Sequence, residues 1–385
     1  MSNTLTDLIT PIYAAVDEVS REMVGAIPAC TVNADQIPTN RLAKDQTVRF
    51  PIVPAASTVN ITPGQVAPDS GDASIGNDTL TISKSKMVPI RFTGNEQKGL
   101  KSGGIYTPIM KDRIAQALRA LVNEIEADLC TAAYQGASRG WGVAGTTPFA
   151  SDIAALAQIK KILDDNGAPK GSRSCIIDTS AGANLRTLNN LSSVYAAGTD
   201  QTLRQGTLLP LFGMDMKESA QIQLHTKGTA TGFDANGGEP VGEVTLVVDG
   251  SDSGTILIGD VVTWAGDSNK YIVKSATASG NAAGNIVINA PGLKATLADT
   301  VEGTLGANYT ANFAFHKSAL HLITGLPEMP EEGDMADEVM TIVDPLTGIA
   351  FEFAMYKQYK RVHYEVGLSW GVKASKPEWI AALLG

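Results

Sequence analysis

The sequence has few cysteines, few histidines and no long hydrophobic run. Its three cysteines are far apart and odd in number, so they offer neither a disulfide framework nor a paired metal-binding motif, and we expect a reducing compartment. The four histidines form no HExxH or similar ligand spacing. No 18 apolar residues run together, and the start of the chain lacks a basic segment followed by an apolar one. We therefore predict no metal centre, no membrane span and no secretory signal.

Positive charge is also scarce. Lys and Arg total 30 against 40 Asp and Glu, a formal net charge of −10, so net attraction to nucleic-acid phosphates is not expected. Hydrophobic residues make up 43% and charged residues 18% of the 385 residues, which is typical of a globular rather than a disordered chain. A chain of this length predicts two or three compact units.

Helical periodicity marks three segments. Apolar residues recur three or four apart over residues 5–23, and a helix there would pack either on its own domain or, as an arm, on a neighbouring subunit. The strongest prediction is a helix over residues 108–134, roughly 40 Å long at 1.5 Å per residue. Another is predicted over residues 151–166, with Ser151 as N-cap and Gly167 as a left-handed stop.

Between residues 46 and 95 the pattern changes to alternation around a stretch rich in Pro, Gly and Asp. Two strands with a long tip predict an extended hairpin. A hairpin of this length cannot bury itself, so it must lie on something, and another copy of the protein is a candidate. The candidate intersubunit contacts here are Phe50, Ile52, Leu80, Ile82, Lys84 and Lys86.

The composition changes abruptly near residue 226. Residues 226–310 contain 14 Gly, no Arg, four Lys and nine acidic residues, so half of the net negative charge lies in under a quarter of the chain. Short strands between turn clusters predict a small all-β barrel or sandwich. Because helix and strand signals resume on both sides, we interpret it as an inserted domain, with its acidic surface facing outward.

The remaining elements are predicted to be short. Alternation or apolar runs indicate strands over residues 174–178, 243–248, 255–258, 261–264, 270–276, 286–288, 313–323, 339–343, 349–357 and 361–372. Further helices are predicted from residue 180 and over residues 377–384.

Two strings after the long helix match catalytic motifs in the wrong context. Residues 136–140, centred on Ser138, match the nucleophile elbow, which needs a strand before it and a helix after it. Residues 140–145 match the dinucleotide fingerprint, which needs a strand, a turn and a helix. Since a predicted helix precedes both strings, we expect a flexible turn between two helices. His316 and His321, five apart in a strand-like segment, would point to opposite faces. No catalytic residue, cofactor or metal ligand is predicted.

Two stretches carry a family resemblance. One is NFAFHKSALHLITGLP at residues 312–327, directly after the β segment. The other runs from DPLTG at residues 344–348 through YKR at residues 359–361 to GVKASKPE at residues 371–378. With the order of the parts, they make the chain similar to the major capsid proteins of tailed bacteriophages, and within them to the P22 coat-protein type, which carries an extra β-domain.

This resemblance implies an α+β, HK97-like capsid fold with an inserted small all-β barrel or sandwich. By position it implies an N-arm over residues 1–45, an E-loop over 46–95, the spine helix and first part of the peripheral domain over 96–177, the first part of the axial domain over 178–225, the inserted β-domain over 226–310, the second part of the axial domain over 311–360, and the peripheral strand and C-terminal segment over 361–385.

The resemblance also implies a structural virion protein rather than an enzyme. Such a protein assembles in the bacterial host cytoplasm into hexamers and pentamers of an icosahedral procapsid, which expands on packaging to enclose double-stranded DNA without sequence-specific binding or a membrane. It implies a portal protein and, since no long N-terminal scaffolding region is visible, a separate scaffolding protein. Nothing identifies a Lys–Asn crosslink. Residues 233–240, with Asp234 and Glu239, are a candidate loop bridging neighbouring capsomers.

Two other functions compete with this interpretation. A β-rich phage tail or adhesin component is favoured by the Gly, Thr and Ser content but opposed by the long central helix. A hydrolase would depend on the two strings at residues 136–145, whose context opposes it.

Overall fold

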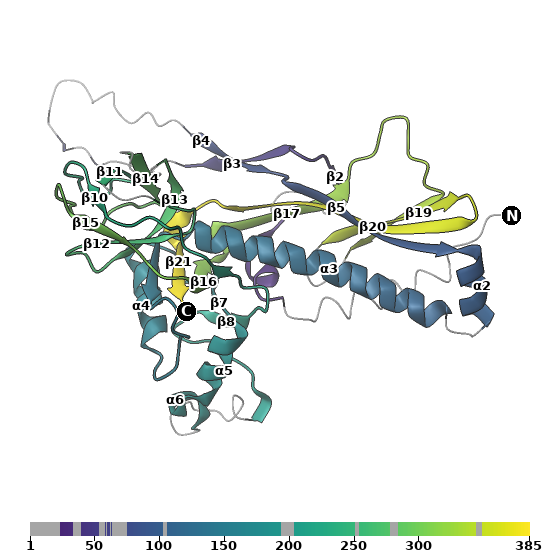
Figure 1. The fold of residues 1–385 in the computed structure, drawn as a ribbon, viewed down its shortest axis with the longest axis horizontal. Coiled ribbons are helices and arrows are strands. Elements are labelled where there is room, and N and C mark those ends of the chain that lie inside the picture. Colours follow the sequence, from purple (N-terminus) through teal and green to yellow (C-terminus); the bar gives the residue numbers. More distant parts are fainter. Residues whose placement is uncertain are drawn as a thin grey trace.

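A long helix and a long strand run side by side and set the shape of the molecule. In the computed structural model, helix α3 (Tyr106–Gln135) and strand β20 (Arg361–Ala374) both extend along the longest axis (Figure 1). The structure describes residues 24–33, 40–53, 58, 60–61, 63, 75–102, 106–193, 204–250, 254–277, 284–343 and 349–385. The expected helix over residues 5–23 and most of the expected hairpin tip lie outside these residues.

Helix α3 packs against a seven-stranded sheet. In this sheet β20 pairs with β17, β19 and β5. Strand β17 also pairs with β1 and β2, and β19 also pairs with β18. The other strands of the sheet are β1 (Thr31–Val32), β2 (Arg41–Leu42), β5 (Lys84–Thr93), β17 (Leu320–Pro327), β18 (Glu338–Val343) and β19 (Ala350–Gln358). Short helix α2 (Gly94–Ser102) joins β5 to α3.

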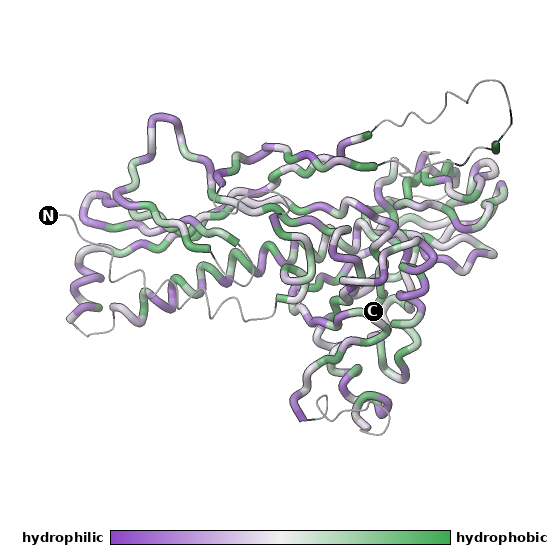
Figure 2. Tube along the Cα trace, turned by 180° about the vertical axis from the view of Figure 1, so that it is seen from behind, coloured by the Kyte–Doolittle hydropathy of each residue, from purple (hydrophilic) through white to green (hydrophobic). Residues whose placement is uncertain are grey.

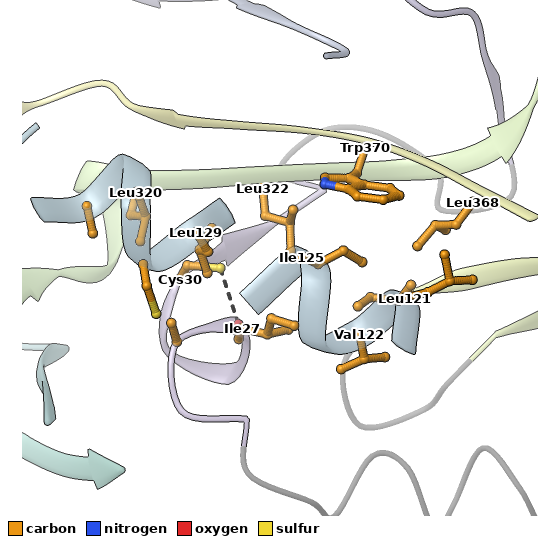
Figure 3. Packing of buried hydrophobic residues seen from close by; sticks show 14 of the residues in the cluster. Ile27, Cys30, Leu121, Val122, Ile125, Leu129, Leu320, Leu322, Leu368 and Trp370 are labelled. Carbon is orange, nitrogen blue, oxygen red and sulfur yellow. Dashed lines mark hydrogen bonds between the residues drawn. The ribbon is translucent and has the colours of Figure 1, made fainter. Parts of the chain in front are cut away.

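The apolar stripe of α3 explains this packing, and the predicted long helix is confirmed. Pro108 lies in its first turn, where a missing N–H breaks no helical hydrogen bond. The buried side of α3 faces the sheet and the short 3-10 helix η1 (Ile27–Ala29). Figure 3 shows this contact among Ile27, Cys30, Leu121, Val122, Ile125, Leu129, Leu320, Leu322, Leu368 and Trp370.

The acidic segment forms a closed β-barrel with its own core. Its strands are β10 (Phe233–Ala235), β11 (Thr245–Gly250), β12 (Val261–Trp264), β13 (Lys270–Ala276), β14 (Gly284–Ile288) and β15 (Glu302–Leu305). The pairing order is β12-β15-β10-β11-β14-β13, all antiparallel, and β13 returns to β12 and closes the ring. A separate hydrophobic cluster, which includes Phe233, Leu246 and Trp264, fills it.

Most barrel strands are predicted from the sequence, but the prediction of a strand over residues 255–258 is wrong. There the Asp260 carboxylate accepts a hydrogen bond from the Leu257 N–H, and Gly259 adopts a φ of 91°. These features make a turn instead of a strand. The short strands β10 and β15 had no prediction, because three or four residues hold too little alternation to show a period.

A second lobe continues the barrel sheet through the order β13-β6-β21-β16-β7-β8. Its elements are β6 (Arg139–Gly142), α4 (Ala154–Asp165), β7 (Arg173–Ile177), α5 (Thr179–Thr187), α6 (Asn189–Ser192), β8 (Asp215–Glu218), β9 (Leu224–His225), β16 (Tyr309–His316) and β21 (Ile380–Leu384). Helices α4 and α5 lie below this sheet in Figure 1. A separate hydrophobic cluster joins these helices to β7 and β21.

The end of the chain corrects one helix prediction. Only Pro377–Trp379 form a 3-10 turn, and Ile380–Leu384 form strand β21 between β16 and β6. All five residues of β21 are buried, because both faces of this central strand are covered. A short, wholly apolar run is ambiguous between a buried helix and a buried strand.

Three further predictions differ from the structure. The strand over residues 313–323 is interrupted by the 3-10 turn Lys317–Ala319, so β16 and β17 lie in different sheets, and the segment 311–360 is divided between them. Residues 139–142 are not a flexible turn but strand β6, paired with β21 and β13. The N-cap of α4 is Ile153 and not Ser151, and the Oδ1 of the preceding Asp152 accepts the Ala154 N–H. Gly167 does have the expected positive φ, at 75°.

Candidate assembly surfaces

The predicted hairpin is shorter than expected and rests on its own chain. Strand β3 (Thr47–Ile52) pairs with β4 (Gly76–Thr81), whereas β5 leaves the hairpin and pairs with β20 along ten residues. Leu80 and Ile82 have no exposed surface and pack with Leu42 and Ile323. These two predicted contacts are therefore corrected, because both serve the core of their own subunit.

The outer part of the hairpin is different, because its apolar side chains face solvent. Phe50 is half-buried and stacks on the His321 ring at 4.9 Å between ring centroids. Beyond it, exposure rises to 42% for Ile52, 82% for Val53 and 69% for Ile75. Apolar side chains gathered at one projecting end are typical of a contact with another molecule.

Lys84 and Lys86 bind helix α3 of their own chain. The Lys84 ammonium lies 2.8 Å from Glu124 Oε1 and 2.9 Å from Asp128 Oδ1, and Lys86 shares the Glu124 oxygen. Partial burial disfavours the charged form of Glu124, but hydrogen bonds from both lysines outweigh it and lower the pKa of this carboxyl. The Trp370 indole N–H donates to Asp128 Oδ2 at 2.9 Å. These lysines tie β5 to α3.

A buried carboxylate on α3 anchors the segment that enters from the N-terminal side. Glu126, with no exposed surface, accepts the N–H groups of Gly25 at 2.8 Å, Ala26 at 2.7 Å and Ile27 at 3.0 Å. These groups precede or open η1, where backbone donors lack helical partners. Burial raises the pKa of Glu126, and the three hydrogen bonds oppose that rise. We did not predict this residue; a lone carboxylate on the apolar stripe of α3 was its one signal.

The barrel meets α3 through a buried polar cluster. His225 Nε2 lies 2.9 Å from Asp260 Oδ1, and His225 Nδ1 lies 3.4 Å from the Tyr134 hydroxyl. The Asp260 carboxylate also accepts the Gly228 N–H at 3.1 Å. Tyr134 lies in the last turn of α3, and Asp260 immediately precedes β12. The cluster therefore fixes the barrel at one end of the long helix.

The predicted bridging loop is partly a barrel strand. Residues 233–235 form β10, and the Glu239 backbone is held by two hydrogen bonds to Leu297. Asp234 lies opposite both Asp249 of β11 and Glu302 of β15, so three acidic residues line up across the barrel. This register concentrates negative charge on one barrel face. Between β10 and the hydrogen-bonded Glu239, only residues 236–238 are left to form a loop.

Residues 138–142 have structural roles. The buried Ser138 hydroxyl donates to the Ile380 carbonyl at 2.9 Å and accepts from the Asn166 amide at 3.0 Å, so it links β6 to β21 and α4. Gly142 adopts a φ of 111°, and a Cβ there would lie 2.5 Å from the Leu384 carbonyl oxygen. Close strand packing thus accounts for a glycine of the fingerprint-like string.

Two other kinds of site have no candidate in the described ranges. There, no three His, Cys, Asp or Glu side chains are grouped as ligands for a metal ion. Nor does any helix among those residues have both the length and the apolar character needed to span a membrane. The three cysteines are buried and unpaired.

Neither a protein-family model nor a curated protein matches the sequence. Among solved structures, one from Mycobacterium phage Che8 is 14% identical, with 88% of this chain and 85% of that chain covered and a TM-score of 0.47. The capsid of cyanophage P-SCSP1u is 14% identical, with coverages of 92% and 86% and a TM-score of 0.48. A virus-like particle from Pyrococcus furiosus is 10% identical, with coverages of 97% and 96% and a TM-score of 0.43. Likenesses this weak assign no function to the chain.

Proposed function

We propose that the chain is the major capsid protein of a tailed bacteriophage, with an HK97-like fold and a P22-type inserted β-domain. In this proposal it assembles in the host cytoplasm into hexamers and pentamers of an icosahedral procapsid, which expands when DNA is packaged. The sequence resemblance at residues 312–327 and 371–378 supports it. An elongated subunit built on one long helix also suits lateral contacts along a shell (Figure 1).

The observation that carries this proposal is the projecting hairpin β3–β4. Its base is built into its own subunit, whereas Ile52, Val53 and Ile75 expose apolar surface that nothing in the described part of the chain covers. A neighbouring copy would cover it and would supply the contacts that a two-stranded sheet lacks. Many such modest contacts around a closed lattice add up through avidity.

Further parts of the proposal concern DNA and partner proteins. Outside residues 226–310 the chain carries 26 basic and 31 acidic residues, nearly balanced, as suits a shell that contains double-stranded DNA without gripping it. The acidic face at Asp234 would point outward, and the segment with Glu239 would approach a neighbouring capsomer. A separate scaffolding protein and a portal protein complete the assembly.

A shortened hairpin tests the proposal. The variant must lose the exposed Ile52, Val53 and Ile75 and keep the buried Leu80, so we replace residues 52–76 with Asn-Gly between the paired residues Pro51 and Asn77. Wild-type protein, expressed with the scaffolding protein of its phage, should give shells by negative-stain electron microscopy. The shortened variant should unfold at the wild-type temperature but give no shells. Normal shells from the variant would contradict the hairpin contact, and isolated wild-type trimers would favour a tail component.

A further inference from the structure

An acidic loop projects from the seven-stranded sheet between β17 and β18. We use this name for residues 328–337, which contain no Lys or Arg and carry the exposed side chains of Glu328, Glu331, Glu332, Asp334 and Asp337. Met335 in the same loop is 92% exposed. Figure 2 shows the loop as a largely hydrophilic arch that rises from the sheet.

A basic hollow of about 850 Å³ lies at the end of the molecule marked by α2. It is formed where β5 enters α2 and where β19 turns into β20. Its lining includes Asn95, Gln97, Lys357, Tyr359, Lys360 and Arg361. Tyr359 is 87% exposed. With Gln358, the lining has three cations, three amides and an exposed aromatic ring, which are suited to an acidic peptide segment with an apolar residue.

Few charges of the two surfaces have an ionic partner within the subunit, although the Lys360 ammonium lies 5.4 Å from the centroid of the Tyr359 ring. Lys357 pairs with Asp337 at 3.3 Å, but within the described ranges no carboxylate lies within ion-pair distance of Lys360 or Arg361. Glu331 and Glu332 likewise contact no described cation. Lys360 also holds a φ of 55°, a conformation that glycine or asparagine adopts more readily. A lysine kept in such a turn suggests a use for its charge.

The loop is tied to its own strand on one side only. Asp334 accepts the Tyr356 hydroxyl, and Asp337 accepts the Lys357 N–H at 3.0 Å. These bonds fix the second half of the loop to β19. The first half follows the end of β17, and Figure 1 shows the loop as an arch that rises away from the sheet. Within the described ranges, no hydrogen bond or ion pair joins Glu331 or Glu332 to a residue of the hollow.

We propose that the acidic loop of one copy docks into the basic hollow of a neighbouring copy, with Met335 against the Tyr359 ring. Opposite charges on two distinct surfaces make a head-to-tail contact, which generates a ring or lattice rather than a closed two-fold dimer. The thioether–aromatic contact and the exposed charge pairs would fix the orientation of one subunit against the next. Most of the binding energy would come from other surfaces, such as the hairpin. This contact deepens the proposed shell function and rests on it.

Charge reversal in separate chains tests the docking. One variant carries Glu331→Lys and Glu332→Lys, and the other carries Lys360→Glu and Arg361→Glu. All four side chains are exposed, so both variants should keep the wild-type unfolding temperature. Each variant alone should yield at least tenfold fewer particles than wild type on sedimentation, because like charges then meet. A single chain that carries all four substitutions should recover particles, since each reversed surface then meets its complement on the next chain.

Covalent trapping gives an independent readout. Because the three native cysteines are buried, one chain with Glu332→Cys and another with Lys360→Cys can be mixed, assembled and oxidised. A disulfide-linked dimer is expected within particles, whereas Glu302→Cys on the barrel, paired with Lys360→Cys, should give none.

The outcomes separate this contact from the proposed function. Normal particle yields for both charge variants, together with no linked dimer, would contradict the docking alone. A disulfide formed within a single chain that carries both cysteines, without linked dimers in the mixture, would also overturn it. Wild-type chains that form no particles would contradict the proposed function and the docking together.

Discussion

The barrel and the hairpin are both antiparallel, but only the barrel completes its own pairing. In the barrel, β12 through β15 join with β10 and β11 in a closed ring around a separate apolar core. The hairpin has two strands, a base packed on β17 and an outer end with exposed apolar side chains. A closed ring leaves no strand edge open, whereas each hairpin strand keeps one.

This difference separates two kinds of energetic role. A side chain inside the barrel should matter to the folding of the subunit whether or not another copy is present. A side chain at the outer end of the hairpin should matter only when another copy is present. Substitutions can therefore be ordered by how much they lower the free energy of unfolding of the isolated subunit. This order tests the difference between the barrel and the hairpin.

The largest cost is expected inside the barrel. Trp264 is 2% exposed and packs edge-on against Phe233, with 5.8 Å between ring centroids. Trp264→Ala should lower the free energy of unfolding by about 3–5 kcal/mol, because it leaves a large cavity. Urea denaturation, with hydrogen exchange at β12 and β15, measures this loss. Trp141→Ala, at a 39% exposed position, is the control, and equal losses at both sites would refute a self-sufficient barrel core.

The next cost should fall on the anchor of the N-terminal segment. Glu126→Ala leaves the Gly25, Ala26 and Ile27 N–H groups without their acceptor and should cost about 3 kcal/mol, since buried unpaired donors are expensive. Glu126→Gln, which keeps one acceptor oxygen, should cost less. Thermal unfolding gives the values, and Asp112→Asn at an exposed position of α3 is the matched control. Equal stability of Glu126→Ala and wild type would exclude an anchoring role.

A smaller cost is expected where β5 meets α3. Lys84 pairs with Glu124 and Asp128, but a third of its side chain is exposed, so solvent weakens both ion pairs. Lys84→Gln should lower stability by about 0.5–1 kcal/mol. Because Lys84 lowers the pKa of Glu124, this contribution is present at neutral pH and declines as the pH falls through the lowered pKa. A variant whose stability loss is unchanged between pH 7 and pH 3 would contradict an electrostatic origin.

The sequence predicts the parts of this molecule that repeat a period and misses those that depend on a single contact. Helix α3 and strands β19 and β20 follow clear periodicities, and their predictions are confirmed. Over residues 380–384 the sequence predicts a helix, which is wrong, because the burial of β21 on both faces removes the alternation of a strand. No local signal showed that β5 would leave the hairpin for β20, since both arrangements need an extended chain.

The candidate surfaces were predictable to a similar degree. Ile52 is predicted as an intersubunit contact and is exposed, but Leu80, on the paired strand four residues nearer the hairpin base, belongs to the core. Alternation indicates which residues share a face and leaves open what covers that face. The basic hollow joins residues near position 95 to residues near position 360, so only the pairing of β5 with β20 brings them together.

The smallest stability effect is expected at the outer end of the hairpin, where the comparison with the barrel is sharpest. Val53→Ser and Ile75→Ser together remove apolar surface that is 82% and 69% exposed, so the free energy of unfolding should stay within about 0.5 kcal/mol of wild type. Shell formation, counted by electron microscopy, should nevertheless fall strongly, because this surface has no other use in the described subunit. Leu80→Ala at the hairpin base should do the opposite in the isolated subunit and destabilise it by about 2–5 kcal/mol. If the exposed pair destabilised the monomer while shells formed normally, the hairpin would be a self-sufficient element like the barrel.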